Sequence, residues 1–197
     1  MWPCLTFVDA RLARGRIPRE TPWATRPTAQ ELYHLGHRGT CRQPVDASAT
    51  LSIDYRASTL APSGIVLLIG TNDLELGGTP EIAGSNLRSI LAAIEQHEAK
   101  TPVILCEVMP SSAFMNRPAS AIKAMNALYR AAAAGDPRIT VLDTWTLFAD
   151  ADGDAPAAFF PDLLHPNADG YAKWAAALRP ILARLRLTGT TGARGTP

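Results

Sequence analysis

Two short polar segments contain side chains suited to acid–base chemistry and to the stabilisation of negative charge. The first is Gly70–Asp73, which reads Gly-Thr-Asn-Asp and directly follows an apolar run. An asparagine at such a place can present its amide as a fixed donor to an oxyanion that develops during acyl transfer. Asn72 and Asp73 are also residue types that commonly end strands in turns, so the segment alone fits a structural role as well.

The second polar segment is Pro161–Pro166, which reads Pro-Asp-Leu-Leu-His-Pro. Asp162 and His165 stand three residues apart in a loop bounded by two prolines. At this spacing the carboxylate can hold the imidazole in one tautomer, which leaves the other ring nitrogen to act as a general base. Taken alone, the segment also fits an ordinary loop.

Alternating strands and helices are expected to position these segments. Continuous apolar runs of this length favour strands that are buried on both faces of a sheet. The expected strands lie within Gly64–Gly70, Thr101–Met109 and Arg138–Asp143. Three helices are expected. The first is capped by Thr79, has Pro80 at its first position and has an inward stripe of Ile82, Leu87, Ile90, Leu91 and Ile94. The second covers Ala119–Ala134, with Ile122, Met125, Leu128 and Tyr129 at helical spacing, and the third runs from the cap Asn167 to about Leu185.

This order of elements predicts a three-layer α/β/α sandwich with a parallel sheet. Folds of this kind bind their ligands beyond the carboxyl ends of the strands. That rule directs attention to Gly70–Asp73, to Met109–Ser112 and to the loop after Asp143. We therefore expect the functional residues to gather at one edge of the sheet.

Length and charge limit the classes of function. The chain has 197 residues and a formal net charge of +1, which suits a single domain and argues against a nucleic-acid binder that depends on phosphate contacts. We expect that domain over residues 1–187, with an atypical segment at 1–59 and a disordered Gly/Thr-rich tail at 188–197. The first 45 residues contain seven arginines against three acidic residues, unlike the rest of the chain.

The sequence shows no pattern of a zinc site, a membrane-spanning helix or a secretory signal. The three cysteines are scattered without a Cys-x-x-Cys pair, so neither a zinc site nor a disulfide framework is predicted. No apolar run approaches the roughly 20 residues that a membrane-spanning helix needs. The first residues lack the pattern of a secretory signal, which predicts a cytoplasmic protein.

The combination of the two polar segments resembles the SGNH (GDSL-type) hydrolase superfamily, whose members are esterases and lipases of flavodoxin-like α/β fold. The resemblance covers residues 60–186 and implies that Asn72 is an oxyanion donor, that His165 is the base and that Asp162 orients it. The segment 34–40 resembles a further block of the family, which implies that Gly39 offers its backbone N–H to the oxyanion. It also fits a glycine-containing turn without a role in a site.

The family's block with the nucleophilic serine is missing. No Gly-Asp-Ser occurs in the chain, and the first serine is Ser48, which lies beyond the Gly39 block. The place of the block corresponds to residues 7–12. Alignment on Asp9 puts Ala10 at the nucleophile position, and alignment on the downstream segment 15–18 puts Arg11 there. Neither side chain can attack a carbonyl.

Three interpretations of the missing serine remain open at the level of sequence. In the first interpretation, the N-terminal segment is altered relative to a normal hydrolase, for example by a frameshift upstream of residue 60. Alternatively, the chain is a pseudo-enzyme that keeps the pocket without the nucleophile. In the third interpretation another hydroxyl attacks, for which Ser111 and Ser112 after the second expected strand are the best placed.

The resemblance implies an ester hydrolase that acts on O-acyl or acetyl esters of small molecules or carbohydrates through an acyl-enzyme. The alternative is a catalytically inactive module of the same fold that binds an ester or a carbohydrate. No Gly-rich phosphate loop follows an expected strand, so no nucleotide cofactor is predicted, and no metal, nucleic acid or membrane span either. A third possibility, an unrelated flavodoxin-like binding domain, would separate Asn72 from His165. The sequence does not predict the oligomeric state.

Overall fold

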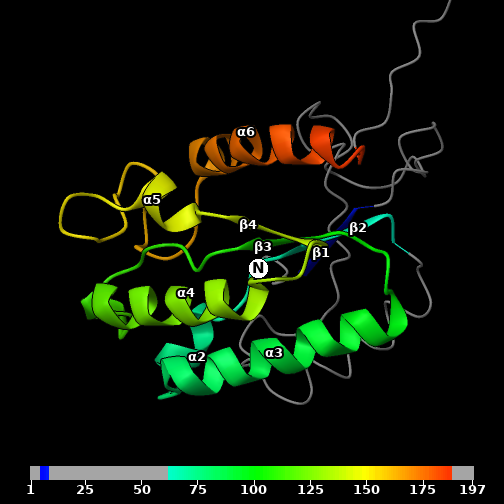
Figure 1. Ribbon diagram of the computed structural model, residues 1–197. Helices are drawn as coiled ribbons and strands as arrows, with labels where there is room; N and C mark the ends of the chain where they lie inside the picture. The colour runs from blue at the N-terminus through cyan, green and yellow to red at the C-terminus, as the bar shows by residue number, and fades with distance from the viewer. Residues whose placement is uncertain (1–4, 9–61, 188–197) are drawn as a thin grey trace, which may run out of the picture.

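The computed structural model describes residues 5–8 and 62–187, and it arranges them as a sheet between two layers of helices (Figure 1). In chain order the elements are β1 (Leu5–Val8), β2 (Gly64–Leu67), α2 (Thr71–Glu75), α3 (Pro80–His97), β3 (Val103–Cys106), the short 3₁₀ helix η2 (Ala113–Met115), α4 (Ala119–Ala133), β4 (Ile139–Leu142), α5 (Thr144–Phe148) and α6 (Ala168–Arg184).

The sheet has the strand order β1-β2-β3-β4. β2, β3 and β4 run parallel, with Ile65 opposite Val103 and Val103 opposite Ile139. This confirms the expected α/β fold with a parallel sheet. β1, which the sequence did not predict, joins the edge of the sheet antiparallel to β2, with Leu5 opposite Leu67 and Val8 opposite Gly64.

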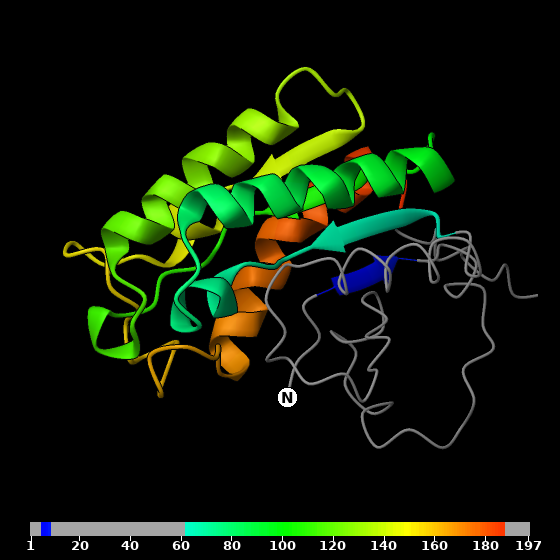
Figure 2. The ribbon, with the colours of Figure 1, turned by 90° about the horizontal axis from the view of Figure 1, so that it is seen from below.

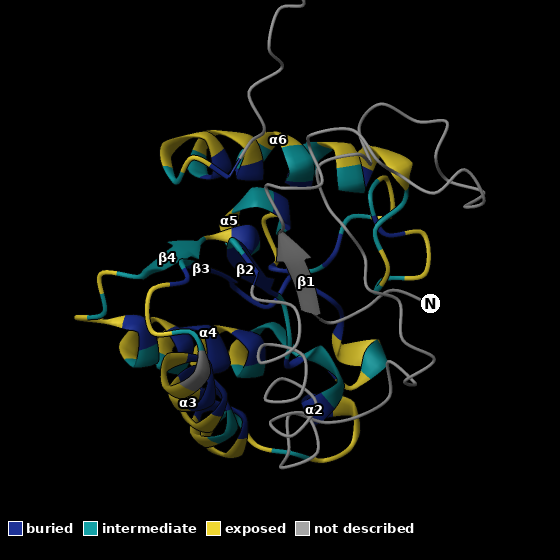
Figure 3. Ribbon diagram, turned by 90° about the vertical axis from the view of Figure 1, so that its right-hand side faces the viewer, coloured by how far each residue is buried: buried dark blue, intermediate teal, exposed yellow. Residues whose placement is uncertain are grey.

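The two faces of the central strands pack against different helices. Ile65, Leu67, Val103 and Leu105 belong to a buried cluster with the apolar side chains of α3 and α4. Val66, Ile104 and Cys106, which point the other way, are buried with residues of α5 and α6. Figures 1 and 2 show α3 and α4 side by side on one face and α6 on the other. Figure 3 shows the same layering as buried central strands between helices with exposed outer faces.

Helix caps confirm the predicted helix starts. Thr79 Oγ1 accepts the backbone N–H of Ile82 at 3.3 Å, and Pro80 is the first residue of α3. Asn167 Oδ1 accepts the backbone N–H of Gly170 at 2.9 Å at the start of α6. Such caps stabilise a helix because they satisfy N–H groups that have no partner within it.

Three local expectations were incomplete or wrong. The side chain of Ile82 is 53% exposed and does not belong to the inward stripe of α3. Leu128 of α4 is only half-buried, whereas Ile122, Met125 and Tyr129 are buried as expected. The sequence does not predict the short elements α2, η2 and α5, because segments of three to five residues are too short to show a helical period.

Candidate active site

Asp162 and His165 form a hydrogen-bonded pair in the loop before α6. Asp162 Oδ2 lies 2.6 Å from His165 Nδ1, and Asp162 Oδ1 accepts the backbone N–H groups of His165 at 2.7 Å and of Leu164 at 3.1 Å. The turn between them contains Leu163 with a φ of 62°, in the left-handed region. Both side chains are more than half exposed, so the imidazole is accessible to a ligand.

The hydrogen bonds keep the Asp162 carboxylate charged. Partial desolvation acts to raise its pKa, but hydrogen bonds from the backbone and ring of His165 and from the backbone of Leu164 outweigh it and lower the pKa to about 2. Because an ionised carboxylate only accepts hydrogen bonds, it selects the His165 tautomer or cation with a proton on Nδ1. Proton exchange with a substrate would then take place at Nε2.

Asn72 lies in the first turn of α2, immediately after the chain leaves β2. The turn depends on Gly70, whose φ of 107° is strained for any residue with a side chain. A Cβ at Gly70 would also lie 2.4 Å from the Tyr129 hydroxyl oxygen. The glycine of the Gly-Thr-Asn-Asp segment therefore allows the sharp change from strand to helix that presents Asn72 at the edge of the sheet.

Arg117 is the residue that packs behind Asn72. Its guanidinium donates from Nε to the Thr71 carbonyl oxygen at 2.9 Å and from Nη1 to the Met115 carbonyl oxygen at 2.7 Å. Nη2 donates to Glu75 Oε2 at 2.6 Å and to Asn72 Oδ1 at 3.4 Å. The sequence did not single out Arg117, because its partners on α2 lie more than 40 positions away in the chain.

Ser111 anchors the turn that contains Asp162 and His165. Its side chain is buried, and its Oγ donates to the carbonyl oxygen of Leu163 at 2.8 Å, inside the Asp162–His165 turn. Ser112 Oγ accepts the backbone N–H of Phe114 at 3.2 Å and caps η2. Both hydroxyls that had been considered as alternative nucleophiles thus have structural hydrogen bonds.

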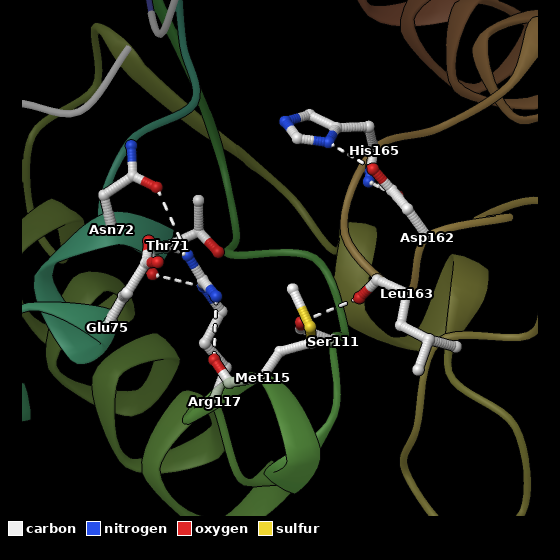
Figure 4. A network of polar contacts seen from close by, with 9 residues as sticks. All are labelled: Thr71, Asn72, Glu75, Ser111, Met115, Arg117, Asp162, Leu163 and His165. Carbon is white, nitrogen blue, oxygen red and sulfur yellow. Dashed lines mark hydrogen bonds and ion pairs between the residues drawn. The ribbon is translucent and has the colours of Figure 1, made fainter.

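One segment therefore connects the two polar clusters. Ser111 and Arg117 belong to the chain between β3 and α4, and they contact the Asp162–His165 turn and α2, respectively. Figure 4 shows this segment between the two clusters, with the imidazole of His165 extended toward the side on which Asn72 lies. Both clusters follow the carboxyl ends of strands or lie beside them, as the position of sites in parallel sheets predicts.

Asp143 and Glu107, which directly follow β4 and β3, form a separate acidic pair. Asp143 Oδ1 accepts the backbone N–H of Thr146 at 2.7 Å and so caps α5. Burial and the neighbouring charge of Asp143 raise the pKa of Glu107, and a salt bridge from the half-exposed Arg130 opposes them. Asn126 closes this region by bonding both the N–H and the carbonyl of Val108, at 2.8 and 3.0 Å. These contacts support the sheet edge rather than the His165 side.

Several predicted positions lie outside the described residues. They are Gly39, Ala10, Arg11, residues 1–4 and the expected tail at 188–197. β1 bears indirectly on the missing serine block, because its carboxyl end at Val8 pairs with Gly64 at the start of β2. The carboxyl end of β1 therefore lies beside the amino end of β2, whereas Asn72 comes after the carboxyl end of β2.

Comparison with known proteins identifies the family and agrees with the fold. Residues 8–173 match the model of the GDSL-like lipase/acylhydrolase family. The chain belongs to this family, and its fold is that of the SGNH hydrolases. The family is one of acylhydrolases and esterases.

Individual relatives are distant. The chain is 30% identical over 138 residues to the platelet-activating factor acetylhydrolase IB subunit alpha1 of Bos taurus, a match that covers 70% of this chain and 58% of that protein. It therefore spans little more than half the length of the curated relatives it matches.

Solved structures extend the likeness of fold. One is an acetyl esterase in which a serine is mutated to alanine, solved with an acetate ion, with a TM-score of 0.64 at 20% identity, covering 89% of this chain and 84% of that one. Another is a carbohydrate esterase of family 3 from Talaromyces cellulolyticus, with a TM-score of 0.62, 20% identity and the same coverage.

No helix among the described residues is both long and apolar enough to cross a membrane. Within residues 5–8 and 62–187, no group of three or more histidine, cysteine, aspartate or glutamate side chains is arranged to hold a metal ion.

Proposed function

We propose that this chain carries the acid–base half of an ester hydrolase site for small O-acyl or acetyl esters, those of carbohydrates included. The observation that carries the proposal is the Asp162–His165 pair, in which a charged carboxylate holds Nδ1 of an accessible imidazole at 2.6 Å. The names of the similar structures, an acetyl esterase and a carbohydrate esterase, support this class of substrate.

Each residue has a distinct role in the proposed reaction. A hydroxyl oxygen attacks the ester carbonyl, and His165 Nε2 takes up the hydroxyl proton and later returns it to the departing alcohol. Asp162 holds the ring in place and stabilises the imidazolium that forms. Asn72 Nδ2, together with the backbone N–H of Gly39, donates to the carbonyl oxygen as it becomes negative. Water then releases the acyl group from the hydroxyl oxygen.

The proposed reaction needs an attacking hydroxyl, and no serine stands at the position where the family has its nucleophile. No serine precedes Ser48, and the hydroxyls of Ser111 and Ser112 hold Leu163 and η2 in place. We therefore expect turnover by this sequence to be weak or absent. In the serine-protease template, loss of a triad member leaves only roughly 10³–10⁴-fold catalysis over water.

These observations also favour a second candidate function, a catalytically inactive module that binds an ester or a carbohydrate at the same site. Such a module needs the donors of the site but no nucleophile. The two candidates differ in covalent chemistry, because only the enzyme has an oxygen that a phosphonate ester can modify.

Covalent labelling tests the two candidates. The protein is incubated with a fluorophosphonate probe, in which the attacking oxygen forms a bond to phosphorus as fluoride leaves, and its intact mass is measured. The enzyme gives a stoichiometric adduct that is lost in His165→Ala. The matched control is Lys100→Ala, at an exposed site in the turn after α3, which keeps the adduct.

Installing a serine tests the altered-block interpretation. Ala10→Ser and Arg11→Ser, each placed after Gly-Asp, are assayed with a short-chain aryl ester. A gain of activity that His165→Ala abolishes supports the hydrolase and identifies the nucleophile position. If neither variant gains activity and no adduct forms while a ligand still binds, the inactive module is the correct function. If Asn72→Ala and His165→Ala also leave ligand binding unchanged, the proposed site is wrong.

A further inference from the structure

Arg117 is a buried cation in direct contact with a proposed catalytic group. Its side chain is 1% exposed, and all of its hydrogen-bond partners named above come from α2 or from its own segment after β3. Burying a guanidinium is costly unless its charge and its N–H groups are satisfied. Here Glu75 provides the charge, and three oxygen acceptors provide the remaining hydrogen bonds.

The contact with Asn72 has only one chemically possible direction. A guanidinium has five N–H donors and no acceptor, whereas an asparagine amide has an acceptor on one side and a donor on the other. Next to Arg117, therefore, only the Oδ1 side of the Asn72 amide is tolerated. The flipped amide would bring its NH₂ group against the NH₂ of the guanidinium, with donor facing donor.

We propose that Arg117 is a positioning residue that fixes the Asn72 amide with Oδ1 inward and Nδ2 outward, and so decides that Asn72 acts as a hydrogen-bond donor at the site. Figure 4 shows this orientation, with the amide nitrogen directed away from Arg117. The inference rests on the proposed function in that the donor is the group an oxyanion needs. The orientation itself is argued from the Arg117 contacts.

The location of Glu75 strengthens the inference. Nη2 bonds Glu75 and Asn72, which are three residues apart on α2, while Nε bonds Thr71 in the same helix. A helix of five residues has little stability of its own, because nucleation is costly. Arg117 thus holds the helix and the amide it carries as one unit.

The test measures the Asn72 side chain directly in folded protein. Three-bond couplings from the Asn72 Cα and Hβ atoms to the side-chain Nδ2 report whether χ2, which sets the direction of the amide, occupies one rotamer, and acetate titrations give the dissociation constant of a carboxylate ligand. We expect a single rotamer in the parent protein and averaged couplings in Arg117→Gln and Arg117→Lys. We expect weaker acetate binding in both, by about ten-fold, the equivalent of one hydrogen bond.

Control variants separate orientation from general damage. Arg88→Gln removes an exposed arginine from α3 and leaves the couplings and acetate binding unchanged. If the Arg117 variants do not fold, Glu75→Gln, at a half-exposed position, weakens the same anchor and gives smaller changes in the same direction. An arginine with a purely structural role would lower the unfolding temperature without changing the Asn72 couplings.

The outcomes distinguish this inference from the proposed function. Unchanged Asn72 couplings in folded Arg117 and Glu75 variants overturn the positioning role. Averaged couplings, together with acetate binding that neither Asn72→Ala nor Arg117→Gln alters, support the positioning role and overturn Asn72 as a donor to the ligand. Averaged couplings with weakened binding in both variants support the two together.

Discussion

Gly70 is the position at which a single methyl group tests the strand-to-helix turn before Asn72. Two features of the structure oppose Gly70→Ala. The backbone φ of 107° is in the region that L residues rarely adopt, and the added Cβ would lie 2.4 Å from Tyr129 Oη and 2.9 Å from Met125 Sδ. Met125 can adjust by rotation of its side chain, whereas the Tyr129 ring is buried and rigidly packed.

The expected cost combines these two effects. A positive φ costs an L residue about 1–2 kcal/mol, and forcing extra volume into a packed core costs about 1–3 kcal/mol. We therefore expect Gly70→Ala to lower the free energy of unfolding by about 2–5 kcal/mol, a large share of the stability of a typical domain.

Gly77→Ala is the matched control. Gly77 ends the same short segment with a φ of 81°, but a Cβ there would have no atom within 4 Å. Its cost should be the strain alone, about 1–2 kcal/mol. The difference between the two variants, measured by urea denaturation with circular dichroism, isolates the contact with Tyr129 and Met125.

A second comparison identifies the opposing atom. Tyr129→Phe removes a hydroxyl that has no hydrogen-bond partner among the described residues, so we expect it to be nearly neutral by itself. In the Gly70→Ala background it should recover part of the loss. Equal costs for Gly70→Ala and Gly77→Ala, or no recovery with Tyr129→Phe, would refute the steric explanation.

Three further predictions concern polar groups that support the His165 turn or the neighbouring edge of the sheet. Ser111→Ala should cost about 1–3 kcal/mol in urea denaturation, because the Leu163 carbonyl loses a buried donor, and it should broaden the NMR signals of the Asp162–His165 turn; unchanged signals would contradict this role. Asn126→Leu should cost about 2–5 kcal/mol by the same measurement, since both backbone groups of Val108 lose their partners, and a cost below 1 kcal/mol would show that they find others. The raised pKa of Glu107 means that the folded state binds its proton more tightly than the unfolded state, so its contribution is present at low pH and is lost as the pH rises through the folded value. The melting temperature of Glu107→Gln minus that of the parent should therefore increase as the pH is raised from 4.5 to 8. A constant difference across that range would be evidence against a raised pKa of Glu107.

The Asp162–His165 interaction should persist at a pH at which ordinary carboxyl groups are already protonated. Asp162, with its pKa lowered to about 2, remains charged when ordinary carboxyls have become protonated. Its contribution to folding is present above the unfolded value near 4 and is lost only as the pH falls toward 2. In an active serine variant, Asp162→Asn should reduce kcat by about 10³–10⁴-fold, as the triad template indicates. Asp152→Asn, at an exposed position in the loop after α5, should leave kcat unchanged.

Local patterns in the sequence were sufficient for the fold class and for the pairing of Asp162 with His165. The strands within Gly64–Gly70 and Thr101–Met109 are buried on both faces, so their residues are apolar without interruption, and that pattern is visible in the chain itself. The Asp162–His165 bond joins residues three apart, and the cap of Thr79 on α3 is equally local. Interactions of this range depend on spacing alone.

The supports of the site and the direction of β1 were decided by tertiary structure. Arg117 bonds Thr71 across 46 positions of the chain, and Ser111 bonds Leu163 across 52. No local pattern indicates which distant carbonyl a buried arginine or serine will reach, because packing of whole strands and helices brings those groups together. The same holds for β1, since a strand of four residues can pair in either direction. The sequence by itself determined the fold class, the spacing of the Asp162–His165 pair and the lack of a serine at the expected place, whereas packing across the sheet decided that Arg117 contacts the Oδ1 side of Asn72.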